Sequence, residues 1–501
     1  MTNRQKFFIN GILLTAVGLA VRTVSLTFNA YITKKIGAEG MGLFTLIGTV
    51  YAFAVTFATS GISLTVTRLI SSAIGEGRQK EEGKILRAAV LYALIFSLFA
   101  TFTLFFGAKY FGGTVLADPR TVVCLRILSA SLVPIALSSV FSGYFIGVKR
   151  VFKNAVIQVT AQVFKISTTA LLIAKFASRG VEAATAALCL GMTLTEIAVF
   201  LAAFLQFIWD KKRISSSGVQ SRGHFHSVSL IALPLAASAY IRSALLTLEH
   251  ALIPKRLRDS GQSHSAALSS YGILHGMALP MLLYPMAPLS SFAGLLVPEF
   301  SESLARGESG RLKRLASEAI NTTLVYAIAA TVLLSTFSEE IGYAVYGSYD
   351  AGRYIALMAP ILPIMYLDHV TDSMLKGIGE QVYSMWVNIS DSFLSIILVW
   401  VLIPRMGIAG YAVVIVVMEG YNFILSAARL YARIGFKIKL FRAVLLPLLA
   451  AMLSAHLSKE IFTAGGSSAE PLWLILKIIF AVCVFLGAYT AANLKIQRKT
   501  S

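Results

Sequence analysis

Long apolar segments separated by short charged ones follow one another from end to end of this chain, and hydrophobic residues make up 56% of its 501 positions. A helix that crosses a bilayer needs about 20 predominantly apolar residues, because the hydrocarbon core is roughly 30 Å thick. About fourteen segments meet this length, the thirteenth only marginally. They are residues 7–32, 42–67, 86–108, 122–147, 156–177, 183–207, 228–253, 268–297, 316–337, 352–378, 382–403, 407–428, 440–456 and 471–494.

Backbone groups find no water inside hydrocarbon, so segments of this length are predicted to be α-helices whose hydrogen bonds are satisfied internally. The loops between them are too short to hold a soluble domain. The predicted fold class is therefore an all-α polytopic membrane protein with about fourteen transmembrane helices.

An internal repeat with a shift of about 230 residues divides the chain into two halves. The stretch 73–78 resembles 303–308, and Gly147 corresponds to Gly377. Each half has six spans, an even number, so the repeat is parallel, with a pseudo-two-fold axis along the membrane normal. This predicts a six-helix lobe at 1–210, a cytoplasmic linker at 211–227, a second six-helix lobe at 228–433, and two additional transmembrane helices with a cytoplasmic tail at 434–501.

The net charge of +20 reflects membrane topology rather than nucleic-acid binding. With the N-terminus placed in the cytoplasm, about 27 basic residues lie inside and about 12 outside, as the positive-inside rule expects. We therefore predict that both termini are cytoplasmic. Basic residues at the membrane surface also suit anionic membrane lipids, and no nucleic-acid partner is expected.

Charged residues inside spans are costly and normally face a cavity or a partner. On this ground Arg22, Arg126 and Arg242 are candidate substrate-binding residues. Arg22 and Arg242 occupy the first and seventh spans, which correspond in the repeat. The repeat therefore predicts a matched arginine in each lobe, facing one central cavity.

Four carboxylates in the spans are candidates for ion coupling or for lining the cavity: Glu249, Asp368, Asp372 and Asp391. Asp368 and Asp372 are four residues apart and share a helix face, with Lys376 one turn further. A simple ion pair along the helix is the competing interpretation, and it is favoured for Asp372 with Lys376. No cofactor is expected, apart from a coupling proton or sodium ion; the alternative driving force is the membrane potential.

No sequence motif for catalysis or metal binding is present: the chain lacks HExxH, GxSxG and a Walker loop. Its cysteines lie in apolar spans without CxxC spacing, which is typical of small buried side chains. We therefore expect neither an enzyme nor a metal site.

Prolines are concentrated in and just after the eighth span, and they predict a broken helix there, because proline removes a backbone donor. The break is interpreted either as a transporter hinge or as a static bend. The prolines are Pro280, Pro285, Pro288 and Pro298.

Several segments resemble a known family: residues 144–147 with Gln158 and Gln162, and residues 249–257, 271–278, 296–302, 372–381 and 388–392. They are similar to the stage V sporulation protein B and polysaccharide transporter family. That family belongs to the multidrug/oligosaccharidyl-lipid/polysaccharide exporter superfamily and is related to lipid II flippases. The resemblance covers nearly the whole chain.

The resemblance implies a bacterial plasma-membrane flippase for an undecaprenyl-pyrophosphate-linked oligosaccharide or peptidoglycan precursor, working by alternating access, with spore cortex as the natural setting. Arg22 aligns with a first-span arginine of the lipid II flippases, whereas Phe28 and Asn29 stand where that motif has a second arginine and an aspartate. By the same resemblance, the two extra helices help to form a groove for the polyprenyl tail.

Two alternatives stay open on the sequence: a cation-coupled multidrug exporter of the same superfamily, and a membrane-embedded glycan polymerase or glycosyltransferase. Drug exporters usually have twelve spans, and a polymerase is expected to carry a large polar catalytic loop. Expected partners are the lipid-linked substrate, membrane lipids and the peptidoglycan synthesis machinery, with the protein acting as a monomer.

Overall fold

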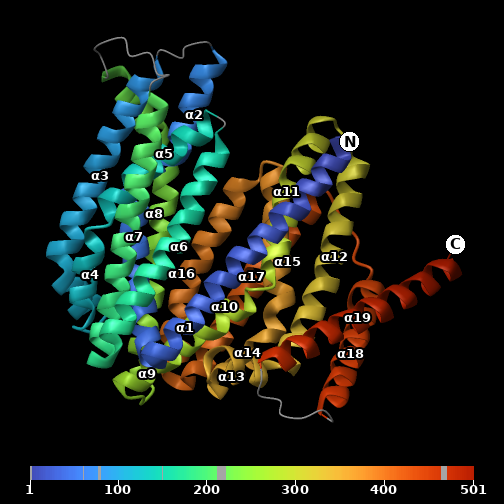
Figure 1. Cartoon of the computed structure of the whole chain (residues 1–501). Coiled ribbons are helices and arrows are strands. Elements are labelled where there is room, and N and C mark those ends of the chain that lie inside the picture. The colour runs from blue at the N-terminus through green and yellow to red at the C-terminus, as the bar shows by residue number, and fades with distance from the viewer. Residues whose placement is uncertain are drawn as a thin grey trace. The chain divides into compact units, whose positions relative to one another are not determined.

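The computed structural model describes residues 3–59, 61–76, 81–148, 150–211, 222–463 and 471–500. These residues form long helices joined by short connections, and no strand occurs among them (Figure 1). The predicted all-α class is confirmed.

Among the described residues, eight α-helices precede residue 260: α1 (Asn3–Thr59), α2 (Ile62–Gly75), α3 (Glu82–Tyr110), α4 (Thr121–Ser129), α5 (Leu132–Gly147), α6 (Val151–Phe176), α7 (Val181–Lys211) and α8 (Arg222–Asp259). The later α-helices are α9 (His264–Gly272), α10 (Leu279–Leu282), α11 (Met286–Ala305), α12 (Ser309–Thr336), α13 (Ser338–Tyr346), α14 (Tyr349–Met358), α15 (Leu362–Gly377), α16 (Gln381–Met406), α17 (Ile408–Arg433), α18 (Leu446–Thr463) and α19 (Pro471–Thr500). Short π-helical or 3₁₀ segments are η2 (Phe111–Val115), η3 (Ala177–Arg179), η4 (Ile273–Ala278), η5 (Ala359–Ile361) and η6 (Phe441–Leu445).

Among the described residues, ten helices are long and apolar enough to cross a membrane, and the number rises to thirteen if each of three bent helix pairs is one span. A multi-pass membrane protein is therefore confirmed, but the count of fourteen is not. The difference lies at the start of the chain, where Arg22–Gly75 is one candidate of 54 residues. Gly37 interrupts α1 there with φ 73° and ψ 179°, a conformation that glycine adopts without strain.

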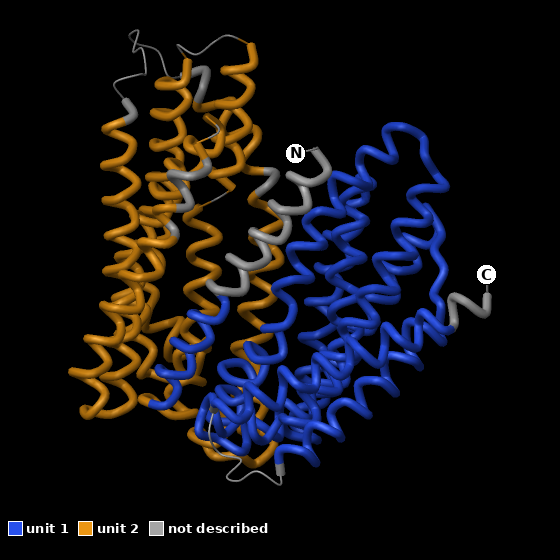
Figure 2. The backbone as a smooth tube through the Cα atoms, turned by 45° about the vertical axis from the view of Figure 1, so that its right-hand side comes forward, with its two compact units in different colours: residues 1–34, 269–501 blue, residues 35–268 orange. Residues whose placement is uncertain are grey.

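Two compact units divide the chain (Figure 2): unit 1 comprises residues 1–34 and 269–501, and unit 2 comprises residues 35–268. This division differs from the predicted lobes because the first part of α1 groups with the second half of the chain. Within unit 1, Asn29 Nδ2 donates to Gly276 O at 3.0 Å. Conversely, Val228 and Ala232 of α8 belong to the apolar core of unit 2. The predicted lobe boundaries concern the repeat and stay a prediction.

The core of unit 2 is built on one face of α2. Ile62, Val66 and Ile70 follow one another at intervals of four residues and are fully buried. This spacing puts them on one side of the helix, where they pack with α3 and α5. Tyr144 on α5 is buried in the same cluster.

One hydrogen bond occurs at corresponding places in the two units. Ser71 Oγ of α2 donates to Gly147 O of α5 at 3.2 Å. Ser301 Oγ of α11 donates to Gly377 O of α15 at 2.7 Å. Donor and acceptor are both displaced by 230 residues, the shift of the sequence repeat. Small residues let helices approach closely enough for such bonds inside a membrane.

Gly377→Ala should destabilise the protein more than Gly147→Ala. A Cβ added at Gly377 would lie 2.7 Å from Phe300 Cβ and 2.9 Å from Val297 O, whereas one added at Gly147 would lie 3.0 Å from its nearest neighbour. Overpacking of this kind costs about 1–3 kcal/mol. The thermal midpoint of the purified protein in detergent measures the effect. Gly487→Ala is the control, because nothing lies within 4 Å of its added Cβ; equal midpoints for Gly377→Ala and Gly487→Ala would contradict the prediction.

Candidate functional site

The proline-rich span is broken in the structure. The helix pair His264–Leu282 and Met286–Ala305 bends by 60°. Pro285 lacks an N–H, and Met286 N donates to Leu283 O at 3.1 Å, three residues back rather than four. Backbone carbonyls at this break therefore need donors from elsewhere, since unsatisfied groups are costly in a membrane.

Two tyrosines from other helices supply such donors. The Tyr366 hydroxyl of α15 donates to Leu282 O at 2.9 Å, and the Tyr326 hydroxyl of α12 donates to Pro285 O at 2.6 Å. Tyr366 is fully buried. Side-chain hydrogen bonds thus satisfy the backbone carbonyls at the break and stabilise the bent helix. Neither tyrosine was identified from the sequence, because a tyrosine in a span looks like any other aromatic residue.

Arg22 supplies the third donor. Its guanidinium Nη1 donates to Leu283 O, and the next residue, Thr23, hydrogen-bonds to the Tyr284 hydroxyl at 2.8 Å. The predicted substrate-binding arginine therefore lies at the break, half-buried in unit 1. A guanidinium has five N–H donors, so one carbonyl does not exhaust its capacity for a phosphate.

The residues that depart from the lipid II flippase motif have packing roles. Asn29 donates to Gly276 O in the π-helical segment η4, as described above, and Phe28 is buried and stacks near Tyr31 with ring centroids 6.5 Å apart. In the same π-helical segment, His275 Nε2 lies 2.9 Å from the Tyr411 hydroxyl. Single-turn π-helices often mark functional positions in helices.

The other two predicted substrate-binding arginines lie in unit 2. Arg126 is exposed on α4, with its guanidinium 5.7 Å from the centre of the Phe105 ring. Arg242 is exposed on α8. Their roles in substrate binding stay predictions.

Three of the four predicted coupling carboxylates lie in unit 1. Asp372 forms an ion pair with Lys376, with 2.8 Å between Oδ2 and Nζ, as the competing interpretation expected. Asp368 is half-buried, receives a hydrogen bond from Ser426, and is close enough to Asp372 and Asp391 to be repelled by their charges.

The fourth carboxylate, Glu249, is buried on α8 in unit 2, whereas Arg242 on the same helix is exposed. Among the described residues, no group of three or more His, Cys, Asp or Glu side chains could hold a metal ion. Ion coupling through these carboxylates stays a prediction.

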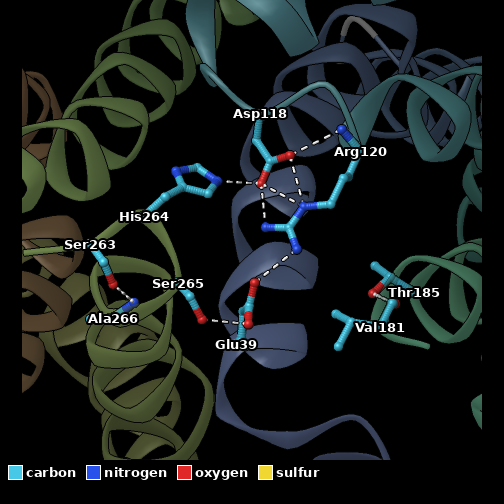
Figure 3. A network of polar contacts seen from close by, with 9 residues as sticks. All are labelled: Glu39, Asp118, Arg120, Val181, Thr185, Ser263, His264, Ser265 and Ala266. Atoms are coloured by element: carbon cyan, nitrogen blue, oxygen red, sulfur yellow. Dashed lines mark hydrogen bonds and ion pairs between the residues drawn. The ribbon is translucent and has the colours of Figure 1, made fainter.

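A polar network in unit 2 was not anticipated from the sequence (Figure 3). Asp118 is 1% exposed, and its carboxylate receives hydrogen bonds from Arg120 Nε at 3.0 Å and Nη2 at 2.8 Å. Arg120 Nη1 also donates to Glu39 Oε1 at 2.8 Å. His264 Nε2 lies 2.9 Å from Asp118 Oδ2, and the Ser265 hydroxyl donates to Glu39 Oε2 at 2.6 Å.

This network joins three parts of unit 2 that are distant in sequence: α1, the turn before α4, and the start of α9. Burial of Asp118 opposes ionisation, but the hydrogen bonds from Arg120 and His264 outweigh it and lower the pKa of Asp118 below its ordinary value. Asp118 is therefore a carboxylate, and it anchors the network. The sequence offered only one signal for it, the Asp118-Pro119 pair that is typical of a turn.

Comparison with known proteins shows which families and structures this chain is similar to. Residues 8–304 match the family model described as polysaccharide biosynthesis protein. The chain is 27% identical over 420 residues to stage V sporulation protein B of Bacillus subtilis (strain 168), covering 82% of this chain and 81% of that protein. It is 23% identical over 484 residues to the lipid II flippase MurJ of the same organism, covering 86% of each.

Solved structures show the same fold. Lipid II flippase MurJ in its inward closed conformation matches with a TM-score of 0.73 and 15% identity, over 97% of this chain and 99% of that one. An inward-facing multidrug resistance MATE family transporter of the MOP superfamily matches with a TM-score of 0.63 and 16% identity, over 83% of this chain and 98% of that one.

Fold and relatives together define a multi-pass membrane protein of the flippase and exporter class, not an enzyme. The chain belongs to the polysaccharide biosynthesis protein family, whose model matches more than half of it.

Proposed function

We propose that this protein is a flippase that moves an undecaprenyl-pyrophosphate-linked oligosaccharide or peptidoglycan precursor across the bacterial plasma membrane by alternating access. Arg22 is the observation that carries the proposal: a guanidinium at a helix break, in a chain similar to a lipid II flippase over 86% of its length. Arginine suits a pyrophosphate because its planar fork binds phosphate oxygens in pairs and stays charged when partly desolvated.

The break in the eighth span supports alternating access. A helix whose carbonyls are held by side chains from α1, α12 and α15 can change its bend by exchanging those hydrogen bonds. Exchange of one set of bonds for another is the kind of two-state element that a transporter needs.

A multidrug exporter is the second candidate, and the lengths of the matches favour the flippase. The likeness to the MATE transporter covers 83% of this chain and nearly all of that protein, whereas the likeness to MurJ covers 97%. In unit 1, α18 and α19 pack on α12 through Ala329, Ala450, Ala451 and Phe485. They are the two helices beyond the twelve that a drug exporter usually has.

Spore cortex is the proposed setting, because the chain is similar to stage V sporulation protein B along most of its length. The test is the appearance of lipid-linked sugar in the outer leaflet of cells depleted of their other flippases. Restored transfer supports the proposal. Drug efflux without transfer of lipid-linked sugar would favour the exporter instead.

Neutralising the coupling carboxylates together should remove the dependence of transport on an ion gradient. The variant carries Glu249→Gln, Asp368→Asn and Asp391→Asn. Carboxylates that face a polar cavity can bind a cation and so favour one conformation, and the neutral amides cannot. Transport is measured with the proton or sodium gradient collapsed and intact. Asp372→Asn is the comparison, since its carboxylate is already paired with Lys376. Unchanged gradient dependence in the triple variant would assign the driving force to the membrane potential.

A further inference from the structure

A small polar pocket lies where α12, η6 and α19 meet in unit 1. Its volume is about 250 Å³, and its polar lining consists of Asn321, Thr322, Lys439, Arg442, Tyr489 and Asn493. Two of these residues are cations, four carry hydroxyl or amide groups, and none of the described lining residues is a carboxylate. A lining of this kind favours an anion.

Hydrogen bonds fix one wall of the pocket. Asn321 on α12 donates from Nδ2 to Lys437 O at 2.9 Å and accepts at Oδ1 from Lys439 N at 2.8 Å. Ser317, one turn earlier, accepts from Lys437 N at 2.9 Å. The connection that carries Lys439 is therefore bound along α12 rather than loose.

Another part of the lining belongs to α19. The Tyr489 hydroxyl donates to Arg442 O at 3.3 Å, which ties α19 to η6. Val325 and Tyr489, which also line the pocket, pack against the apolar cluster of Ala329, Ala451 and Phe485. The lining thus combines cations with apolar side chains that continue into an apolar cluster, and this combination suits an amphiphile.

We propose that this pocket binds the phosphate of one anionic phospholipid, with Lys439 and Arg442 as its charged partners. Basic pockets between transmembrane helices bind lipid headgroups in this manner. Thr322 and Asn493 add neutral donors for phosphate oxygens. Leu486 and Leu494 of α19 are exposed apolar side chains on which an acyl chain can lie.

The size of the pocket separates a bilayer lipid from the proposed transport substrate. Pockets for drug-sized ligands have volumes of roughly 300–1,000 Å³, and this cavity is smaller. It holds one phosphate with a small polar group, not an oligosaccharide. The inference therefore does not depend on the proposed function, and either can fail without the other.

Native mass spectrometry of the detergent-purified full chain tests the proposal, with phosphatidylglycerol and phosphatidylcholine titrated separately. Wild type should retain one phosphatidylglycerol in preference to phosphatidylcholine. The double variant Lys439→Gln, Arg442→Gln should bind phosphatidylglycerol about thirty-fold more weakly. Each cation near a membrane surface contributes a factor of about five to six in affinity for an anionic lipid, and two such factors multiply to about thirty. Lys459→Gln is the matched control, since Lys459 is exposed on α18 and does not line the pocket.

Thr322→Leu is a second test, which applies even if the double variant fails to fold. The larger side chain occupies space in the pocket, and both charges stay in place. This variant too should lose the bound lipid. Equal binding of the two lipids by wild type would overturn the proposal, as would retention of phosphatidylglycerol in both variants. Displacement of the lipid by inorganic phosphate, or much tighter binding of undecaprenyl phosphate, would assign the pocket to a different ligand and overturn it as well.

Discussion

Under the proposed function, Arg22→Ala and Arg242→Ala, alone and together, should abolish the transfer of lipid-linked sugar to the outer leaflet while the protein still inserts. A pyrophosphate must leave water on its way across the membrane, and its charge needs fixed positive partners there. Truncating one partner of a desolvated charge pair costs about 3 kcal/mol, which corresponds to more than a hundredfold in rate. The measurement is outer-leaflet lipid-linked sugar in cells depleted of other flippases, normalised to the amount of protein in the membrane.

Lysine at either position should restore only part of the transport, because a point charge lacks the paired donors of the guanidinium fork. Arg22 also holds Leu283 O, so loss of this bond must be separated from loss of the charge. Tyr326→Phe is the control, since it removes the comparable bond to Pro285 O and leaves the charge in place. Wild-type transport in the double alanine variant would reject the role of the arginines. A loss in Tyr326→Phe as large as in Arg22→Ala would assign the effect of Arg22 to the helix break.

Asp118→Ala should lower stability more than any other single change in the polar network of unit 2. It leaves Arg120 without its two-point partner and removes the acceptor of His264. Breaking a buried ion pair costs 3–5 kcal/mol, and we expect about 3 kcal/mol because Arg120 is still partly hydrated. The thermal midpoint of the purified protein in detergent should therefore fall by several degrees. Asp350→Ala is the matched control, because its ion pair with Arg353 is exposed and contributes little.

The same carboxylate sets an acid limit on stability. Because the pKa of Asp118 is lowered in the folded protein, its contribution is complete above the ordinary value of 3.8 and is lost as the pH falls through the lowered value. The difference in midpoint between wild type and Asp118→Ala should therefore be constant at neutral pH and shrink in strong acid. A difference that grew on acidification would contradict this assignment.

Hydrophobic patterning was enough to predict the fold class. Most spans are long and apolar in their own right, and a bilayer admits few alternatives to a helix. One pair of bonds follows the shift of the predicted repeat, because Ser71–Gly147 and Ser301–Gly377 depend on small residues that leave a trace in sequence. The arrangement at the start of the chain was not predictable. Gly37, with its positive φ, interrupts α1 there, and the hydrophobic pattern of the segment gives no sign of this.

The site was predictable only in part. Its charge within a span makes Arg22 a candidate, since a charged side chain inside the membrane is costly and normally faces a cavity or a partner. Its hydrogen-bond acceptor is a backbone carbonyl, however, and carbonyls exist at every residue. Tyr326, Tyr366 and the Asp118 network depend on contacts between segments far apart in the chain, which no local pattern encodes.

A phosphate that needs Nη1 of Arg22, and not only the N–H donors that Leu283 O leaves unused, competes with Leu283 O for the guanidinium. The apparent affinity for a ligand that needs the released side chain falls in proportion to the fraction of time that Arg22 spends off the carbonyl. The same arithmetic acts in reverse: a bound phosphate that draws Arg22 away leaves Leu283 O with one donor fewer and makes the bend easier to change. Without a ligand, the Arg22–Leu283 bond therefore restrains the bend of the broken helix. Under the proposed function, the transported lipid itself removes this restraint.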